Sequence, residues 1–178
     1  MIDKQELLFV VDENNRPLKP KPRSFVHKNK LWHRTAHIYV VNRKGQLLCQ
    51  KRSKKKDTNP DKWEPFFGGH LNSREEYPAV AVKEINEEIG LDIEESALIP
   101  YKIHRNAHHP EFRMIYKVYW DGDIGSLRLE EDEVDRVEWF DIREVGKILL
   151  SKNPNWTLKE NDEEVISWIK KPSSTIPS

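Results

Sequence analysis

Residues 74–88 carry the pattern that most restricts how this chain can fold. Apolar side chains recur there with the spacing of one helix face, namely Ala81, Val82, Ile85 and Ile89. Gly90 follows, and glycine commonly ends a helix because it adopts left-handed backbone angles without strain. The pattern predicts an amphipathic helix from about residue 74 to 88 that packs on a core through its apolar stripe.

The same helix carries three carboxylates on one side. Glu84, Glu87 and Glu88 stand at i, i+3 and i+4, so their charges lie close together. Unneutralised like charges at this spacing destabilise a helix by roughly a few tenths of a kcal/mol per pair. A divalent cation would remove that cost, and oxygen ligands favour Mg²⁺ or Mn²⁺ over zinc. The alternative is an acidic, solvated helix face.

The overall composition narrows the class of protein. The chain has 178 residues, enough for one domain with short additions. It holds 30 Lys and Arg against 30 Asp and Glu residues, which argues against binding to a nucleic acid polymer or a membrane surface. The one cysteine, Cys49, excludes an internal disulfide. We expect a cytoplasmic protein without a signal peptide or membrane span.

Strands and helices alternate along the rest of the chain, which indicates an α/β (α+β) fold. Alternating or short apolar runs predict strands over 7–11, 16–18, 37–41, 46–52, 98–105, 114–120 and 134–140. Helices are predicted over 141–150, with Asp141 as a cap, and over 162–170. Polar loops are expected over 53–62 and 122–131.

The spacing of residues 69–91 resembles the Nudix box, Gly-x5-Glu-x7-Arg-Glu-U-x-Glu-Glu-x-Gly-U, where U is a bulky aliphatic residue. The matching positions are Gly69, Glu75, Glu84, Ile85, Glu87, Glu88, Gly90 and Leu91. The resemblance implies a Nudix fold over residues 31–171, in which α-helices sandwich a mixed β-sheet. Residues 1–30 would form an N-terminal β-hairpin extension, and residues 172–178 a disordered tail.

The resemblance also implies a set of site residues. Glu84, Glu87 and Glu88 would hold Mg²⁺ or Mn²⁺ and supply the general base, with Glu75 and Lys83 orienting them. Gly68 and Gly69 would let the backbone turn tightly near the metal, and Gly69 would also contact the substrate. The base can instead lie on a later loop, where the candidates are Glu130, Glu131 and Glu133. A solvated acidic loop is the other interpretation of those three residues.

Lys83 is the one departure from the box, which has arginine at that position. Arginine binds a carboxylate through a planar fork, whereas lysine offers a point charge. Lysine is therefore compatible with slower turnover or with an altered or lost activity.

Residues 31–91 also resemble the isopentenyl-diphosphate-isomerase-like branch of the superfamily. The matching segments are 31–37, 46–53 and 59–63. By this resemblance Arg52 and Lys56 would bind the diphosphate, although Lys56 also reads as part of a solvated basic loop.

The isomerase holds its metal with histidines. His33 and His70 match two of these, and His27 matches a third with a one-residue offset. The isomerase's catalytic cysteine is replaced by Gly68, and Cys49 reads as a small core residue. His33 and His70 can therefore be structural or contact the phosphate rim.

Two further groups are weaker candidates. Glu64 precedes the box and is a candidate specificity contact with the substrate. His104, His108 and His109 cluster in the sequence, and we interpret them as a polar loop near the site rather than as a zinc site.

The leading hypothesis is a Mg²⁺-dependent hydrolase of a phosphoanhydride bond in a small nucleoside diphosphate-X type substrate. Its rivals are an isopentenyl-diphosphate delta-isomerase-like enzyme and a non-catalytic nucleotide-binding module. The N-terminal strand pair is a candidate contact for a homodimer. The sequence leaves the group attached to the diphosphate open, because loops determine such specificity.

Overall fold

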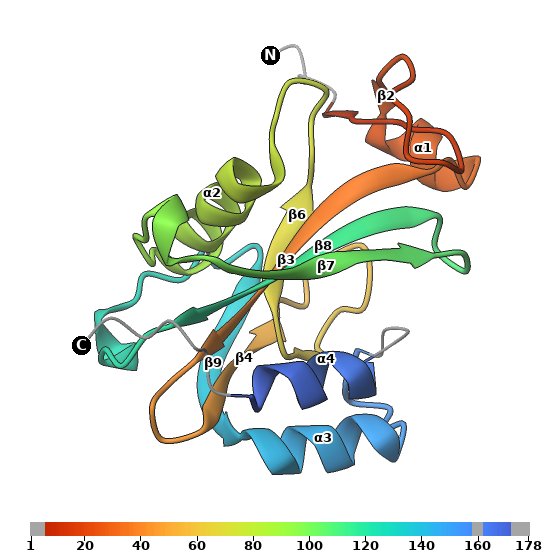
Figure 1. The fold of residues 1–178 in the computed structure, drawn as a ribbon. Helices are drawn as coiled ribbons and strands as arrows, with labels where there is room; N and C mark the ends of the chain where they lie inside the picture. Colours follow the sequence, from red (N-terminus) through yellow and green to blue (C-terminus); the bar gives the residue numbers. More distant parts are fainter. Residues whose placement is uncertain (1–5, 158–161, 172–178) are drawn as a thin grey trace. The chain divides into compact units, whose positions relative to one another are not determined.

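A computed structural model describes residues 6–157 and 162–171 (Figure 1). The chain divides into two compact units. Unit 1 comprises residues 1–38, 67–87 and 91–116, and unit 2 comprises residues 39–66, 88–90 and 117–178. The expected tail over residues 172–178 lies outside the described residues.

Unit 1 begins with a small antiparallel strand pair, β1 (Leu7–Leu8) and β2 (Lys21–Pro22), followed by the short helix α1 (Arg23–Lys28). Leu8, Val10 and Val26 form a buried cluster, with Leu31 packed against it. This cluster explains α1, a helix that the sequence analysis missed: Val26 gives it one apolar anchor, and Pro22 ends the strand before it.

The strands of unit 1 surround the first half of β3 (His33–Val41). Strand β6 (Phe67–His70) pairs antiparallel with β3, so that Thr35 lies opposite His70 and Ala36 opposite Gly69. Strands β8 (Glu111–Tyr119) and β7 (Ile99–Asn106) follow on the other side of β3. The 3-10 turn η1 (Glu95–Ala97) precedes β7.

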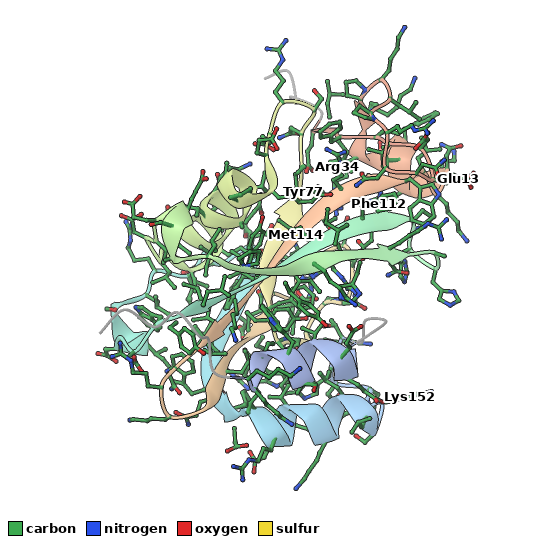
Figure 2. The ribbon with its side chains drawn as sticks, viewed as in Figure 1. Glu13, Arg34, Tyr77, Phe112, Met114 and Lys152 are labelled. Atoms are coloured by element: carbon green, nitrogen blue, oxygen red, sulfur yellow. The ribbon has the colours of Figure 1, made fainter. Side chains whose placement is uncertain are left out.

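Helix α2 (Tyr77–Ile89) is the predicted amphipathic helix. Its apolar face is buried through Val80, Ala81, Ile85 and Ile89. Figure 2 shows the start of the helix, where the guanidinium of Arg34 lies 5.7 Å from the ring centre of Tyr77. Gly90 has a φ of +67°, so it ends the helix as expected.

In unit 2, β4 (Gln46–Arg52) pairs antiparallel with β3, β5 (Trp63–Glu64) and β9 (Val134–Asp141). The short turn η2 (Ile124–Ser126) precedes β9. Helices α3 (Ile142–Leu150) and α4 (Asp162–Ile169) pack on each other. Asp141 caps α3 as predicted, because its side chain accepts a hydrogen bond from the backbone N–H of Arg143 at 2.7 Å.

The α/β (α+β) fold class is confirmed, and several boundaries differ from the prediction. Strand β3 starts at residue 33 rather than 37, and β8 starts at residue 111 rather than 114. The partner of β1 is residues 21–22, whereas residue 17 forms only an isolated bridge with residue 11. Strand β6 was not predicted, because two adjacent glycines weaken the sequence signal for a strand. None of the helices described is long and apolar enough to cross a membrane.

Candidate functional site

Glycines at the start of the candidate site bring β6 very close to its neighbours. A methyl side chain at Gly69 would place its Cβ 2.3 Å from Oε2 of Glu84. One residue earlier, Gly68 has a φ of +147°, and a Cβ there would lie 2.0 Å from the carbonyl oxygen of Ala36. At Gly68 the neighbour is backbone, which excludes any larger residue, whereas at Gly69 a larger residue would require the side chain of Glu84 to move. Strand β6 therefore presents its backbone to the carboxylate of Glu84.

Lys83 joins two of the predicted carboxylates in unit 1. Its Nζ lies 3.2 Å from Oε1 of Glu75 and 3.6 Å from Oε1 of Glu84. Glu75 is itself fixed, because its Oε2 accepts a hydrogen bond from the backbone N–H of Asn72 at 2.7 Å. The lysine that replaces the box arginine therefore contacts Glu84, one of the three carboxylates that it was expected to orient, and Glu75, which was expected to orient them with it.

The side chain of Glu84 is a weaker acid than an ordinary carboxyl group. Burial raises the pKa of Glu84 to about 7, the nearby charge of Glu87 adds to this rise, and Lys83 opposes it. Glu87 is exposed on the helix surface. Near neutral pH, Glu84 can therefore both hold and release a proton.

Glu88 belongs to unit 2 and is buried there. The amide of Gln50 on β4 donates to the carbonyl oxygen of Phe66 at 2.7 Å and to Oε2 of Glu88 at 3.4 Å. The sequence analysis missed Gln50, since a single glutamine in a strand gives no signal. The acidic loop is held against the end of α2, because the backbone N–H of Glu130 donates to the carbonyl oxygen of Glu88 at 2.9 Å.

The predicted phosphate-binding cations already have carboxylate partners. Arg52 contacts Oε2 of Glu64 through Nη1 at 2.8 Å, and both side chains are largely buried. Its Nε and Nη2 donate to the carbonyl oxygen of Thr58 at 3.2 and 2.9 Å. Lys56 forms an ion pair with Glu133. Arg52 therefore ties the start of the basic loop to Thr58 within it, and Glu64 balances the charge of Arg52.

Three histidines from separate elements of unit 1 converge. They are His27 on α1, His33 on β3 and His70 on β6, and their ligand atoms all lie within 4.8 Å of one another. Nε2 of His27 lies 3.1 Å from Nε2 of His70. Burial lowers the pKa of His33, which favours the neutral, metal-binding form. Within residues 6–157 and 162–171, no other group of three His, Cys, Asp or Glu side chains converges in this way.

The other residues considered from the sequence are dispersed. His104 is buried on β7, whereas His108 and His109 are exposed in the turn after it, where their N–H groups donate to Oδ1 of Asn106. Cys49 is fully buried, as predicted for a core residue, and burial raises the pKa of its thiol.

The chain matches the NUDIX domain family over residues 31–169. It therefore belongs to the Nudix family. It is a hydrolase that acts on pyrophosphate bonds, a reaction that the family performs on small-molecule diphosphates.

Two relatives illustrate the branches that this chain resembles. It is 34% identical over 157 residues to an uncharacterized Nudix hydrolase of Clostridium acetobutylicum, covering 83% of this chain and 76% of that protein. It is 32% identical over 87 residues to isopentenyl-diphosphate delta-isomerase 2 of Photorhabdus laumondii, covering 49% of each chain. The isomerase likeness is thus limited to about half of the molecule.

Solved structures show the same fold. A crystal structure from Deinococcus radiodurans has a TM-score of 0.72 at 19% identity, covering 93% of this chain and 100% of that one. A MutT protein from Methanosarcina mazei has a TM-score of 0.56 at 18% identity, covering 76% of this chain and 91% of that one.

Proposed function

We propose that this protein is a Mg²⁺- or Mn²⁺-dependent hydrolase of a phosphoanhydride bond in a nucleoside diphosphate-X type substrate. The observation that carries the proposal is the contact of Glu84 with the side-chain-free backbone of Gly69. This contact holds a partly buried carboxylate at a place where no side chain at residue 69 covers it.

Carboxylate oxygens are the ligands that a hard divalent cation prefers. In this proposal Glu84, Glu87 and Glu88 supply them from one helix, and the side chains draw together on the cation, since among the described residues they do not converge as the three histidines do. Lys83 and Glu75 hold Glu84 from the side. A bound Mg²⁺ supplies charge neutralisation at the phosphate oxygens and activates water. Glu84 accepts a proton readily near neutral pH, which suits a general base, and Glu131 and Glu133 are the alternative bases on the loop.

In this proposal Arg52 and Lys56 bind the distal phosphate by exchanging carboxylate partners for phosphate oxygens. Glu64 and Glu133 occupy the positions that an anion would take, because carboxylate and phosphate bind the same cationic groups. Glu64 would then turn from a counter-ion to a contact with the substrate, and His70 would lie at the phosphate rim.

The test is phosphate and pyrophosphate release from nucleoside di- and triphosphates, nucleotide sugars, dinucleotides and coenzyme A, with and without Mg²⁺. The matched variants are Glu87→Gln, which removes an exposed carboxylate of the set, and Glu163→Gln, which removes an exposed carboxylate on α4. We expect release from one class of substrate, a loss of at least one hundredfold in Glu87→Gln, and none in Glu163→Gln. Full turnover in Glu87→Gln would remove the box from the mechanism.

The histidine cluster favours one second candidate, an isomerase of prenyl diphosphates that binds a metal through His27, His33 and His70. Imidazole nitrogens suit zinc, copper, iron or nickel. Gly68 in place of a catalytic cysteine argues against this function. Metal analysis of the purified protein, combined with an assay for interconversion of the two five-carbon diphosphates, decides it. Bound metal without interconversion would leave the cluster as a metal site and exclude the isomerase.

A further inference from the structure

The side chain of Arg34 joins segments of unit 1 that are far apart in the sequence. Its guanidinium lies 4.4 Å from the ring centre of Phe9 and 5.7 Å from that of Tyr77, the first residue of α2 (Figure 2). Its Nε and Nη2 donate to Oδ1 and to the carbonyl oxygen of Asn15 at 2.8 and 2.9 Å. This arginine of β3 therefore contacts both the N-terminal extension and the start of α2, the helix that carries Glu84.

The turn over residues 12–16 holds Asn15 in a defined position. Oδ1 of Asp12 accepts hydrogen bonds from two backbone N–H groups of the turn, at 2.8 and 2.9 Å. Asn15 has a φ of +63°, in the left-handed region that asparagine enters more readily than most residues. The turn is closed by its own hydrogen bonds, so it offers Arg34 two fixed acceptors.

The backbone of Arg34 and the extension also hold Leu71 from two sides. The backbone N–H of Leu71 donates to the carbonyl oxygen of Arg34 at 3.0 Å, and its carbonyl oxygen accepts from the N–H of Phe9 at 2.7 Å. The next residue, Asn72, forms an isolated antiparallel bridge with Leu8. Leu8 and Leu71 are both fully buried. The segment after β6 is therefore fixed by β3 on one side and by the extension on the other.

Asn72 connects this segment to the candidate site. Its backbone N–H donates to Oε2 of Glu75 at 2.7 Å, while Oε1 of the same carboxylate lies 3.2 Å from Nζ of Lys83. Nζ of Lys83 in turn lies 3.6 Å from Oε1 of Glu84. One oxygen of Glu75 thus binds the fixed backbone and the other binds the lysine. The place of Lys83 beside Glu84 therefore depends on where residue 72 is held.

We propose that Arg34 is a positioning residue for the hydrolase and that it acts through Glu75 and Lys83 on Glu84. By joining the N-terminal extension to the start of α2, it holds residues 71–72 in place. The proposal rests on the proposed hydrolase function, because the position of Glu84 has a consequence only during turnover. It goes further by giving the extension a part in that turnover.

A purely structural arginine would behave differently. It would change the free energy of unfolding and leave kcat of the folded molecules unchanged. An arginine that positions Glu84 lowers kcat, whereas KM stays nearly unchanged because Arg52 and Lys56 bind the phosphate in the proposed function.

The first experiment measures kcat and KM of Arg34→Lys and Asn15→Gly with the substrate that the release assay identifies. Lysine keeps the charge but lacks the fork that binds both acceptors of Asn15. Glycine removes one acceptor and adopts the left-handed φ of residue 15 without strain, so this variant keeps its turn. We expect kcat to fall about tenfold in Arg34→Lys and less in Asn15→Gly. Arg16→Lys, which changes an exposed arginine of the same turn, is the matched control and should be unchanged.

The second experiment combines Arg34→Lys with Glu75→Gln in a double-mutant cycle. Because Arg34 acts through Glu75, the double variant should be no slower than Glu75→Gln alone. Losses that multiply would overturn the proposal, and so would an unchanged kcat in a folded Arg34→Lys protein. Urea unfolding shows which variants are folded, and Asn15→Gly takes the place of Arg34→Lys if the latter is not.

Amide hydrogen exchange separates this proposal from the hydrolase function, because it requires neither metal nor turnover. The N–H of Asn72 that donates to Glu75 should exchange about tenfold faster in Arg34→Lys than in the wild type, and at the wild-type rate in Arg16→Lys. Unchanged exchange in Arg34→Lys and Asn15→Gly would overturn the proposal even where a substrate is found. Faster exchange in a protein without turnover would keep Arg34 as the residue that positions Glu75 and would remove the hydrolase function instead.

Discussion

Gly69 lies so close to Glu84 that the size of one side chain tests the contact. Gly69→Ala would place a methyl group 2.3 Å from the present position of Oε2 of Glu84. The carboxylate must then move by an ångström or more, which in an active site typically costs about a hundredfold in rate. We expect this loss in kcat/KM for whichever substrate the release assay identifies.

The control for this prediction is Gly146→Ala, in helix α3. A Cβ there would lie 3.4 Å from Cγ2 of Ile166, an ordinary contact, and alanine favours a helix over glycine by roughly 0.5–1 kcal/mol. Activity should be unchanged in this variant. Equal activity in Gly69→Ala would show that the close approach of β6 to Glu84 has no catalytic importance.

The pKa of Glu84 predicts how stability depends on pH in the metal-free protein. Burial raises this pKa from 4.5 to about 7, so between these values the folded state holds a proton that the unfolded state has released. Stability should therefore fall as pH rises from 4.5 to 7. Glu84→Gln should remove this slope and stabilise the protein at pH 8 by on the order of 2 kcal/mol.

Urea unfolding at a series of pH values, in EDTA, measures this effect. The exposed Glu87 provides the control, because Glu87→Gln should leave most of the slope in place. If stability depends on pH equally in Glu84→Gln and in the wild type, a group other than Glu84 takes up the proton.

At the scale of elements, the loop between β4 and β5 depends on one ion pair. Arg52 neutralises the buried Glu64 and also holds Thr58. Arg52→Met leaves a buried carboxylate without its cation, a change that typically costs about 3–5 kcal/mol. Most of the loss should be recovered in the double variant with Glu64→Gln.

Denaturant unfolding of the single and double variants measures this coupling, and KM for the substrate separates it from phosphate binding. Lys55→Met is the control, because its ion pair with Asp132 is exposed and should contribute nothing measurable. If Arg52→Met raises KM without loss of stability, the arginine binds the substrate and does not stabilise the loop.

Helix α2 and strand β6 differ in how well the sequence predicts them. The stripe ending at Ile89 has a regular period, and Gly90 ends it, so the helix was predicted to within three residues at its start and one at its end. Strand β6 contains Gly68 and Gly69. Glycine is needed at both positions because residues distant in the sequence lie too close for a side chain. Local patterns cannot reveal such contacts.

At the scale of the whole molecule, the C-terminal helix is an integral part of unit 2. Val165, Ile166 and Ile169 of α4 are buried, and a methyl group of Ile166 lies on Gly146. Ile166→Ala should therefore destabilise the protein by about 2–4 kcal/mol through lost burial and a cavity. Thermal unfolding measures this, with Leu150→Ala, an exposed leucine on α3, expected to change little.

The fold class and the box helix could be predicted for this chain, while the gathering of distant residues could not. The resemblance suggested His33 and His70 and, with an offset of one residue, His27. The structure brings all three together, with His27 on α1, a helix that was not expected. Gln50 gave no signal at all, since a polar residue in a strand reads as a solvated position. The division at residue 30 and the homodimer contact remain predictions, and sedimentation analysis tests the latter.

Adjacent residues of β6 serve different faces of a sheet: Gly69 faces Glu84, and His70 faces His27 and His33. A slip of β6 along β3 by one residue would exchange these faces. Such a slip would also turn the fully buried Phe67 out of the core, which opposes it. The burial of one phenylalanine in a four-residue strand therefore keeps both the contact with Glu84 and the histidine cluster in place.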